Sequence, residues 1–350
     1  MENITAVTDR DLAIDDVIVV AGAGGFIGGH FVKYLLNCGF VNIRAVDKKP
    51  VSRWYQRFNN FQNICLDLTN EENCKAVVED AREVYNFAAD MGGMGFIESH
   101  RIECMRSVLI NTHLLESSYM AGVNRYLFSS SACVYNGKLQ ESVDNHGLKE
   151  SDAYPALAEE GYGWEKLYSE MMCQEYWLER GMKTFIPRYH NVYGIKGSWD
   201  GGREKAPAAI CRKVIDTLDK GTNEIEIWGD GEQTRSFTYI DDAIYGIDLI
   251  MHCNALIATP INLGSEEMVS INELVSIAEQ VAGDVKLERK YKKDAPLGVR
   301  GRSSDNTFIR KTLNWYPDTT LSWGMEKTYN WIESQYNKRK SGQKVFENME

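Results

Sequence analysis

A phenol and an ammonium group stand four residues apart at Tyr162 and Lys166, a spacing that places both on one face of a helix. Such pairs often lie on solvated helix faces, but this one follows a serine-rich strand end that carries Ser131. Ligands sit at strand ends in doubly wound sheets, and a nearby cation lowers the pKa of a tyrosine from ~10. We therefore expect Tyr162 to remove a hydroxyl proton as hydride leaves the same carbon, while Ser131 holds that hydroxyl.

A glycine-rich turn directly follows the first apolar segment, with glycines at Gly22, Gly25 and Gly28. An apolar helix pattern with Phe31, Leu35 and Leu36 follows it, and the turn residues Phe26 and Ile27 are expected to lie against the cofactor with the glycines. A turn of this kind lets the backbone approach a pyrophosphate and points the first N–H groups of the helix at it. This pattern predicts a dinucleotide site, although a tight strand-to-helix turn without a ligand would look similar.

The second apolar segment ends at Asp47, and 47 − 28 = 19 residues separate it from the last glycine. An acid about 20 residues beyond the glycines hydrogen-bonds the adenosine ribose in dinucleotide-binding folds. Its carboxylate would repel a 2′-phosphate, so we expect NAD as the cofactor. Lys48 and Lys49 follow at once and leave NADP open.

These groups need a sheet and crossover helices to position them. Short apolar runs that read as strands alternate with amphipathic stretches, and lie at 17–21, 43–46, 84–87, 126–129 and 184–187. This alternation predicts an α/β fold with a Rossmann-type, doubly wound parallel sheet.

After Arg188 the pattern changes to Gly-rich loops, and we expect a smaller mixed substrate domain there. Its elements are predicted as helices at 206–218, 271–281 and 323–336 and a strand at 224–228. The predicted division is a NAD-binding domain at 14–188, to which later segments return, a mainly substrate-binding domain at 189–337, and a flexible tail at 338–350.

The composition narrows the function further. The chain of 350 residues has a net charge of −11, which disfavours binding to nucleic acid or anionic membranes. Its longest apolar runs are far shorter than the roughly 20 residues of a membrane span. The eight cysteines include no CxxC pair, which argues against a zinc site and a disulfide framework and favours a reducing cytoplasm. We expect no metal site.

The glycine spacing resembles the extended short-chain dehydrogenase/reductase family. Three further features match that family's pattern in the expected order, namely Asp67 with Leu68, the 86–89 segment that contains Ala88, and Asn111. The resemblance implies that Asp67 and Leu68 meet the adenine and that Ala88 lies in the NAD site.

Longer segments resemble the GDP-mannose 3,5-epimerase branch of that family, and they span both lobes at 88–97, 131–135, 201–209, 228–237 and 298–302. The resemblance implies that Cys133 removes a proton from C3 or C5 of a nucleotide-activated hexose and that Lys205 returns one. A transient C4 ketone acidifies both neighbouring C–H bonds, so an acid and a base acting there can invert them. Cys133 lies two residues after Ser131 and would point the same way if the strand continued.

The expected substrate-binding residues come from the same segments. They comprise a loop whose backbone closes over the hexose, the catalytic groups, and two arginines for the diphosphate: Gly92, Met94, Gly95, Ser131, Cys133, Asn191, Lys205, Arg235 and Arg302. For several of them a purely structural role stays open, since a cysteine near a strand end is usually a buried apolar residue and surface lysines and arginines are common. Asn136 departs from the branch's pattern, as does the stretch before Val17.

Other functions remain in view. The same Ser-Tyr-Lys group and NAD would serve a 4,6-dehydratase, a decarboxylase, a 4-epimerase or a reductase, but Ala132 and Cys133 replace the acid pair typical of dehydratases. A non-catalytic NAD-bound scaffold usually lacks the tyrosine or the lysine. The family implies a homodimer, for which the amphipathic stretches 101–120 and 162–180 are the expected contact. The base of the nucleotide cannot be predicted from these residues.

Overall fold

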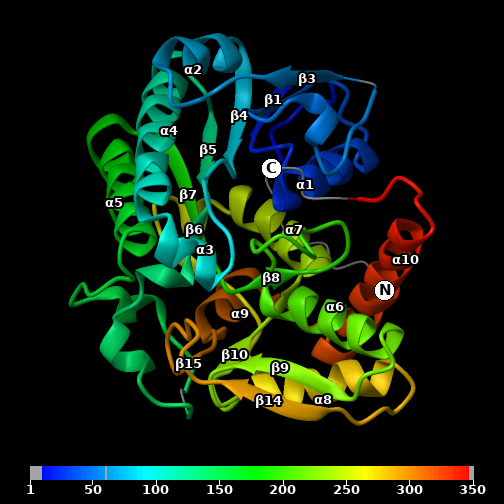
Figure 1. The fold of residues 1–350 in the computed structure, drawn as a ribbon. Helices are drawn as coiled ribbons and strands as arrows, with labels where there is room; N and C mark the ends of the chain where they lie inside the picture. Colours follow the sequence, from blue (N-terminus) through cyan, green and yellow to red (C-terminus); the bar gives the residue numbers. More distant parts are fainter. Residues whose placement is uncertain (1–9, 60, 145, 347–350) are drawn as a thin grey trace.

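A parallel sheet forms the centre of the protein in a computed structural model that describes residues 10–59, 61–144 and 146–346 (Figure 1). The strand order is β12-β7-β5-β4-β1-β2-β3, and β6 pairs with β7. The strands are β1 (Val17–Ala21), β2 (Ile43–Asp47), β3 (Gln62–Cys65), β4 (Ala81–Asn86), β5 (Arg125–Phe128), β6 (Ser130–Ser131), β7 (Lys183–Tyr189) and β12 (Pro260–Leu263). The doubly wound fold is thereby confirmed.

Helices cover both faces of this sheet because the side chains of its strands alternate between two cores. Ile18 of β1 faces the core of Phe31, whereas the next residue, Val19, faces the core of Leu114. The first face carries α1 (Phe26–Asn37) and α7 (Ile240–Met251), and the second carries α2 (Glu71–Val78), α4 (Arg101–Met120) and α5 (Tyr162–Arg180) (Figure 1).

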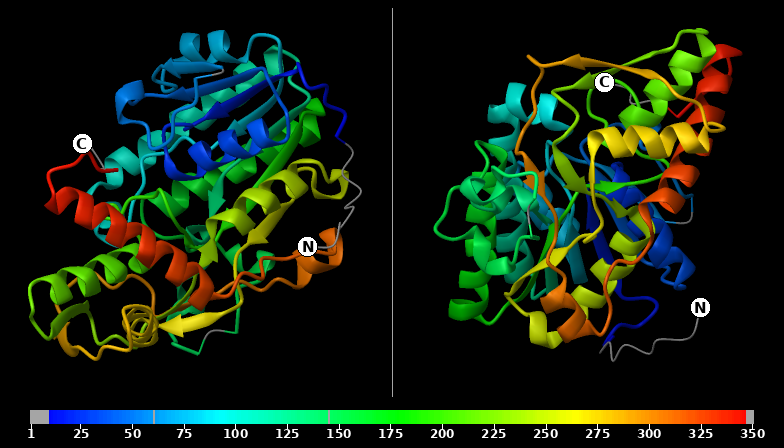
Figure 2. Two further views of the ribbon diagram at one scale, coloured as in Figure 1. Left: turned by 90° about the vertical axis from the view of Figure 1, so that its right-hand side faces the viewer. Right: turned by 90° about the horizontal axis from the view of Figure 1, so that it is seen from below.

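The smaller lobe is mixed, as expected, and packs three helices against short strand pairs (Figure 2). Its helices are α6 (Ala206–Asp219), α8 (Ile271–Val281) and α10 (Leu321–Lys340). The strand groups are β9 (Glu224–Trp228) with β14 (Glu288–Lys292), β10 (Thr234–Ser236) with β13 (Met268–Ser270) and β15 (Gly301–Arg302), and β8 (Val192–Tyr193) with β11 (Thr238–Tyr239).

Short helices connect these parts. They are α3 (Met94–Ser99), α9 (Thr307–Leu313) and the 3₁₀ turns η1 (Val51–Arg53), η2 (Ala132–Val134), η3 (Gly137–Gln140), η4 (Glu150–Ala153) and η5 (Asn254–Leu256). Among the described residues, no helix is long and apolar enough to cross a membrane.

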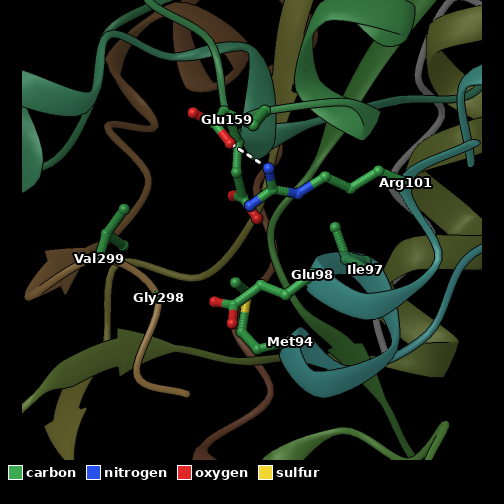
Figure 3. Close-up of a pocket in the computed structure, with 8 residues that line it drawn as sticks. Met94, Ile97, Glu98, Arg101, Glu159, Gly298 and Val299 are labelled. Atoms are coloured by element: carbon green, nitrogen blue, oxygen red, sulfur yellow. Dashed lines mark ion pairs between the residues drawn. The ribbon is translucent and has the colours of Figure 1, made fainter.

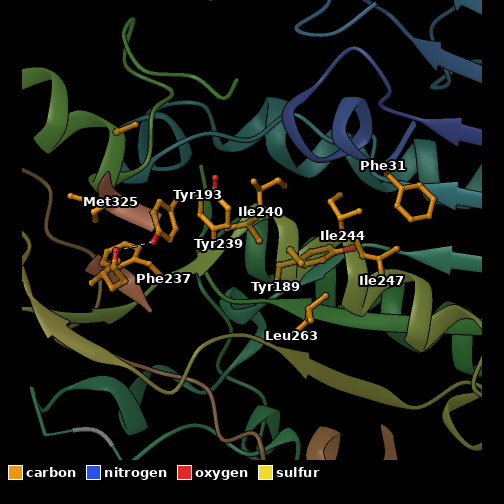
Figure 4. Close-up of a cluster of buried hydrophobic side chains, with 14 of the residues drawn as sticks. Phe31, Tyr189, Tyr193, Phe237, Tyr239, Ile240, Ile244, Ile247, Leu263 and Met325 are labelled. Atoms are coloured by element: carbon orange, nitrogen blue, oxygen red, sulfur yellow. Dashed lines mark hydrogen bonds between the residues drawn. The ribbon is translucent and has the colours of Figure 1, made fainter. Parts of the chain in front are cut away.

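One hydrophobic core joins the two lobes. Tyr193 packs edge-on against Tyr239, with ring centroids 5.7 Å apart, and against Phe237. The same cluster continues through Ile240 to Phe31 under the glycine-rich turn (Figure 4). Because interiors are close-packed, this shared core fixes the substrate lobe against the cofactor lobe.

The C-terminal region differs from the prediction of a tail from 338 onward. Helix α10 continues to Lys340, and the Phe346 ring packs 4.9 Å from the Tyr55 ring and 5.2 Å from that of Trp331. The Trp199 Nε1–H donates to the Phe346 carbonyl at 2.7 Å. The tail prediction was wrong for residues 338–346 because it rested on local polarity, whereas an aromatic side chain finds distant aromatic surface to cover. Residues 347–350 lie outside the described part.

Candidate active site

The glycine-rich turn leaves no room for side chains. Gly22 has a φ of +81°, and a Cβ there would lie 2.8 Å from the backbone of Phe87 and Ala88. A Cβ on Gly28 would lie 2.3 Å from the Gly22 carbonyl oxygen, and Gly25 is the N-cap of α1. These glycines bring the first turn of α1 close to β1 and keep its backbone open to a pyrophosphate. The cradle therefore fits a dinucleotide.

Asp47 ends β2, where its Oδ1 accepts a hydrogen bond of 2.9 Å from the Lys49 N–H. The neighbouring lysines are engaged by the protein, since Lys49 Nζ donates to the Gly24 carbonyl at 2.9 Å and Lys48 Nζ pairs with Asp90 at 2.6 Å. This arrangement places a carboxylate at the predicted ribose position. It also engages Lys48 and Lys49, the two cations that could otherwise pair with the 2′-phosphate of NADP.

The other predicted cofactor residues lie around the same sheet edge. Phe26 and Ile27 begin α1 and pack partly buried on the main core. Asp67 accepts hydrogen bonds from the Thr69 N–H and Oγ1, which lower its carboxyl pKa although desolvation opposes them. The Leu68 side chain is buried in the second core. Their contacts with the adenine stay a prediction.

Buried amides fix the end of β4 beside the turn. Asn86 Oδ1 accepts from the Ala88 N–H at 3.2 Å, and its Nδ2 donates to the Tyr126 hydroxyl oxygen at 3.0 Å. The Tyr126 hydroxyl donates to Asn111 Oδ1 at 2.8 Å. Asn111, which the sequence pattern singled out, thus supports the strand end on which Ala88 sits.

The structure brings Ser131, Tyr162 and Lys166 together. Ser131 ends β6, Tyr162 begins α5, and the Lys166 Nζ lies 5.4 Å from the Tyr162 ring centroid. Burial raises the pKa of Tyr162 well above 10, and the Glu165 carboxylate, 3.4 Å from Lys166 Nζ, raises it further. The expected lowering of this pKa, which the positive charges of Lys166 and the nicotinamide were to produce, is not present in the protein without NAD, because burial, Cys133 and Glu165 all raise it.

Cys133 lies in η2 rather than in a continued strand, so the expected alternation with Ser131 does not apply. Instead the Ser131 Oγ accepts from the Cys133 N–H at 3.2 Å and caps the turn. The Cys133 carbonyl accepts from the Glu159 N–H at 2.9 Å. A turn, not a strand, therefore sets the direction of the thiol, which still packs in one buried cluster with Tyr162.

Arg302 contacts this thiol. Its Nη1 lies 3.6 Å from Cys133 Sγ, its Nη2 pairs with Glu159 Oε2 at 3.2 Å, and its Nε donates to Gln140. Sequence analysis assigned Arg302 to a diphosphate and did not identify Glu159 or Gln140. No local motif marks these two residues, because they reach the site from separate loops.

Lys205 approaches the same centre from the N-cap of α6, and its Nζ donates to the Gly92 carbonyl at 3.2 Å. Burial lowers the pKa of Lys205 and raises that of Cys133, while each favours the charged form of the other. Their proton affinities are thereby brought toward one another. Groups with similar pKa values exchange protons with little driving force, which suits an acid–base pair.

Two of the segments that resemble the epimerase branch, 88–97 and 201–209, contact one another. The Gly93 N–H donates to the Arg203 carbonyl at 3.2 Å, and the Arg203 guanidinium lies 3.8 Å from the Phe96 ring centroid. A Cβ on Gly92 would lie 2.8 Å from the Phe96 side chain, whereas one on Gly95 would lie 3.6 Å from that of Trp228. The glycine-methionine loop, residues 91–95, is thus held against the loop that carries Lys205.

A cavity of about 180 Å³ opens beside this centre (Figure 3). It is lined by Met94, Ile97, Glu98, Arg101, Glu159, Glu160, Gly298 and Val299. Ile97 belongs to the buried cluster of Cys133 and Tyr162, so the cavity adjoins the reacting groups through α3. Arg101 pairs with Glu160 at its rim.

Arg235 is a partly buried cation held by carbonyl groups of Thr234, Leu297, Val299 and Arg300. Desolvation and the nearby Arg302 lower the pKa of Arg235 to about 9, so it stays charged at neutral pH. A partly buried guanidinium next to a second cation favours binding of an anion. Asn191, with a φ of +43°, donates through Nδ2 to the Ser236 carbonyl at 3.0 Å on the same strand group.

A comparison with protein families shows to which family the chain belongs. Residues 18–264 match the NAD dependent epimerase/dehydratase family. The chain belongs to this family. NAD is accordingly the cofactor, in agreement with the glycine cradle and with Asp47 at the end of β2. The chain is 40% identical over 325 residues to GDP-mannose 3,5-epimerase of Arabidopsis thaliana, an alignment that covers 93% of this chain and 84% of that protein.

Solved structures of the same fold carry related ligands. The UDP-glucose 4-epimerase of Thermotoga maritima with UDP-glucose superposes with a TM-score of 0.80 at 25% identity, over 91% of this chain and 99% of that one. The complex of MoeE5 with UDP-glucose and NAD gives 0.75 at 27% identity, over 92% and 99%. Both similarities extend through the substrate lobe.

Proposed function

We propose that the protein is a GDP-mannose 3,5-epimerase, which converts GDP-mannose to GDP-L-galactose by inversion at C3 and C5, and to GDP-L-gulose when only C5 is inverted. The observation that carries this proposal is the coupling of two groups: Cys133, buried in one cluster with Tyr162, and the partly buried Lys205, whose charge acts on that thiol. The 40% identity to the Arabidopsis enzyme over 93% of the chain supports the same substrate.

The reaction begins and ends at C4 of the hexose. When bound, NAD would supply the oxidation and the later reduction at C4. Tyr162 takes the proton of the C4 hydroxyl, and Ser131 holds that hydroxyl in place. Lys166 contributes positive charge 5.4 Å from the Tyr162 ring, which favours the phenolate. Burial and Glu165 oppose ionisation of Tyr162, and the positive charge of a bound nicotinamide would act against them.

The inversions belong to Cys133 and Lys205. A ketone at C4 makes the hydrogens at C3 and C5 acidic, because the electron pair left behind is delocalised onto the carbonyl oxygen. Cys133 removes such a proton, and Lys205 delivers one to the carbon, so that a C–H bond is broken and another formed. A dehydratase would instead need an acid pair after the serine, where this chain has Ala132 and Cys133.

The diphosphate of the nucleotide sugar is assigned to Arg235 and Arg302. Arg302 is a buried cation and Arg235 a partly buried one, and the protein carries a net charge of −11, so an anionic substrate depends on such local charge. The glycine-methionine loop, including Gly92, Met94 and Gly95, is assigned to the hexose because it adjoins both Lys205 and the cavity.

We further propose that the protein forms a homodimer through α4 and α5. These paired helices expose large apolar side chains: Ile102, Met105, Leu109, Met120, Trp164, Tyr168, Met171 and Leu178. Such a patch is typical of an interaction surface. Ile102→Asp should therefore yield monomers in sedimentation experiments, whereas Val41→Asp, at an exposed position outside these helices, should not. A monomeric native protein would contradict this assignment.

We propose a cytoplasmic location, which the free cysteines support.

Solvent exchange tests the proposed function. In deuterated water the protein should incorporate deuterium from solvent at C3 and C5 of GDP-mannose with no net change in nicotinamide absorbance. Cys133→Ser and Lys205→Ala should each lose this exchange while they retain bound NAD. Undiminished exchange in both variants would remove the roles assigned to these residues.

A further inference from the structure

Glu159 joins the reacting groups to the cavity. Its Oε2 pairs with Arg302 Nη2 at 3.2 Å, and Arg302 Nη1 reaches Cys133 Sγ at 3.6 Å. The Arg302 and Cys133 side chains are buried, and that of Glu159 is largely buried. A single guanidinium is therefore shared between a carboxylate and the proposed base.

Glu159 also holds Cys133 through the backbone. Its N–H donates to the Cys133 carbonyl at 2.9 Å, and a Cβ on Gly163 would lie 2.3 Å from that carbonyl oxygen. The carbonyl of the turn that carries the thiol is thus held by Glu159, three residues before α5, and lies close against the first turn of α5. A substitution that changes only the Glu159 carboxylate leaves this backbone hydrogen bond intact.

The carboxylate is not fully used by the protein. Glu159 Oε1 is buried and has no hydrogen-bond partner among the described residues, and the side chain lines the cavity of about 180 Å³ (Figure 3). A buried acceptor without a donor costs free energy in the ligand-free protein. A hydroxyl of a sugar in the cavity can donate to this oxygen, which gives Glu159 a place in the working site.

We propose that Glu159 is a positioning residue that holds Arg302 against Cys133 and whose negative charge keeps both Cys133 and Lys205 protonated until substrate is bound. This inference rests on the acid and base roles proposed for those two residues. It adds a carboxylate to the machinery, one that acts through Arg302 and through its own electrostatic field.

The surrounding charges give the sign of the effect. Cys133 is faced by Glu159, Arg302 from β15, Lys205 from the start of α6, Tyr162 of α5 and the Ser131 hydroxyl. After burial, Glu159 is the group that most raises the pKa of Cys133, whereas Arg302 and Lys205 lower it. The same carboxylate raises the pKa of Lys205, against burial and Arg302. Removal of this one charge must therefore lower both values.

Glu159→Gln is the decisive variant, because glutamine keeps the shape, the acceptor for Arg302 and the backbone hydrogen bond. Alkylation of Cys133 by iodoacetamide, followed as a function of pH by mass spectrometry of the Cys133 peptide, reports its thiolate without substrate. The midpoint should move down by about one to two pH units, as expected for loss of a unit charge several ångströms away at an effective dielectric constant of about 20. Arg302→Gln should move it up.

Glu160→Gln is the matched control, since Glu160 lines the same cavity but pairs with Arg101 at the exposed rim. Its midpoint should equal that of the native protein. A Glu159→Gln midpoint that is unchanged or raised would overturn the proposal, and Glu159→Ala gives the same test if the glutamine variant does not fold. Failure of the proposed function is separate: it would appear as solvent exchange that persists in Cys133→Ser, whatever the thiol titration shows.

Discussion

Replacement of Arg235 with glutamine removes a partly buried charge from the region assigned to the diphosphate. The guanidinium is held by carbonyl oxygens from β10 and from the loop that contains Leu297, Val299 and Arg300. In the proposed function, this positive charge acts by binding an anion, the diphosphate of the substrate. The variant should therefore bind GDP more weakly and remain folded.

The magnitudes follow from the surroundings of Arg235. Burial and Arg302 lower its pKa from 12.5 to about 9, which corresponds to about 5 kcal/mol against the charged form in the folded, ligand-free protein. Glutamine removes this cost but makes fewer hydrogen bonds to the carbonyl groups, which contribute about 1 to 1.5 kcal/mol each. These two effects oppose one another, so the unfolding temperature should change little. A charge-assisted hydrogen bond to phosphate contributes about 1.5 to 3 kcal/mol, so GDP should bind about 10- to 150-fold more weakly.

Titration calorimetry with GDP measures this loss directly, and Arg300→Gln is the matched control. Arg300 is a neighbour in the same loop, but its guanidinium pairs with Asp230 at 3.0 Å and is partly exposed. The control should bind GDP within about threefold of the native protein, because exposed ion pairs contribute little. Unchanged GDP affinity in Arg235→Gln, with its NAD content intact, would refute the assignment of this residue to the diphosphate.

Two further predictions concern the cofactor cradle and stability. Gly28→Val should abolish retention of NAD, measured as nucleotide released on denaturation, because even its Cβ would lie 2.3 Å from the Gly22 carbonyl oxygen; a variant that retains NAD would contradict the cradle. Carboxylates of Glu83 and Asp248, 3.2 and 3.3 Å from the His252 ring nitrogens, outweigh desolvation and raise its pKa to about 9. The interaction of protonated His252 with these two carboxylates stabilises the folded state by about 3 kcal/mol below pH ~6.5. This stabilisation is lost as pH rises through about 9. Denaturant titrations should show this loss in the native protein and not in His252→Gln.

The fold could be predicted wherever burial leaves a local pattern. The expected 17–21, 224–228 and 271–281 segments coincide with β1, β9 and α8, because a buried strand, an alternating strand and an amphipathic helix each have a distinct period. The edge strand β3 was missed because half of its residues are exposed and carry no apolar run. Strand β12 was missed because it is short, and its pairing with β7 depends on residues more than seventy positions away.

The site divides in a similar way. The glycine turn and the Tyr162–Lys166 spacing are local, so their chemistry could be read directly from the sequence. The contacts of Arg302 with Glu159 and Gln140 join three separate segments, and no spacing encodes them. The raised pKa of Tyr162 likewise depends on burial, which appears only when α5 packs against η2 and the strand ends.

A C4 label tests the central claim most directly. GDP-mannose that carries deuterium at C4 should yield products that retain this deuterium at C4, while C3 and C5 acquire hydrogen from ordinary water. A C4 hydride that is held by the protein-bound cofactor and returned to the same carbon gives this outcome. Loss of the C4 deuterium to water, or inversion at C3 and C5 by protein that holds no NAD, would contradict the account.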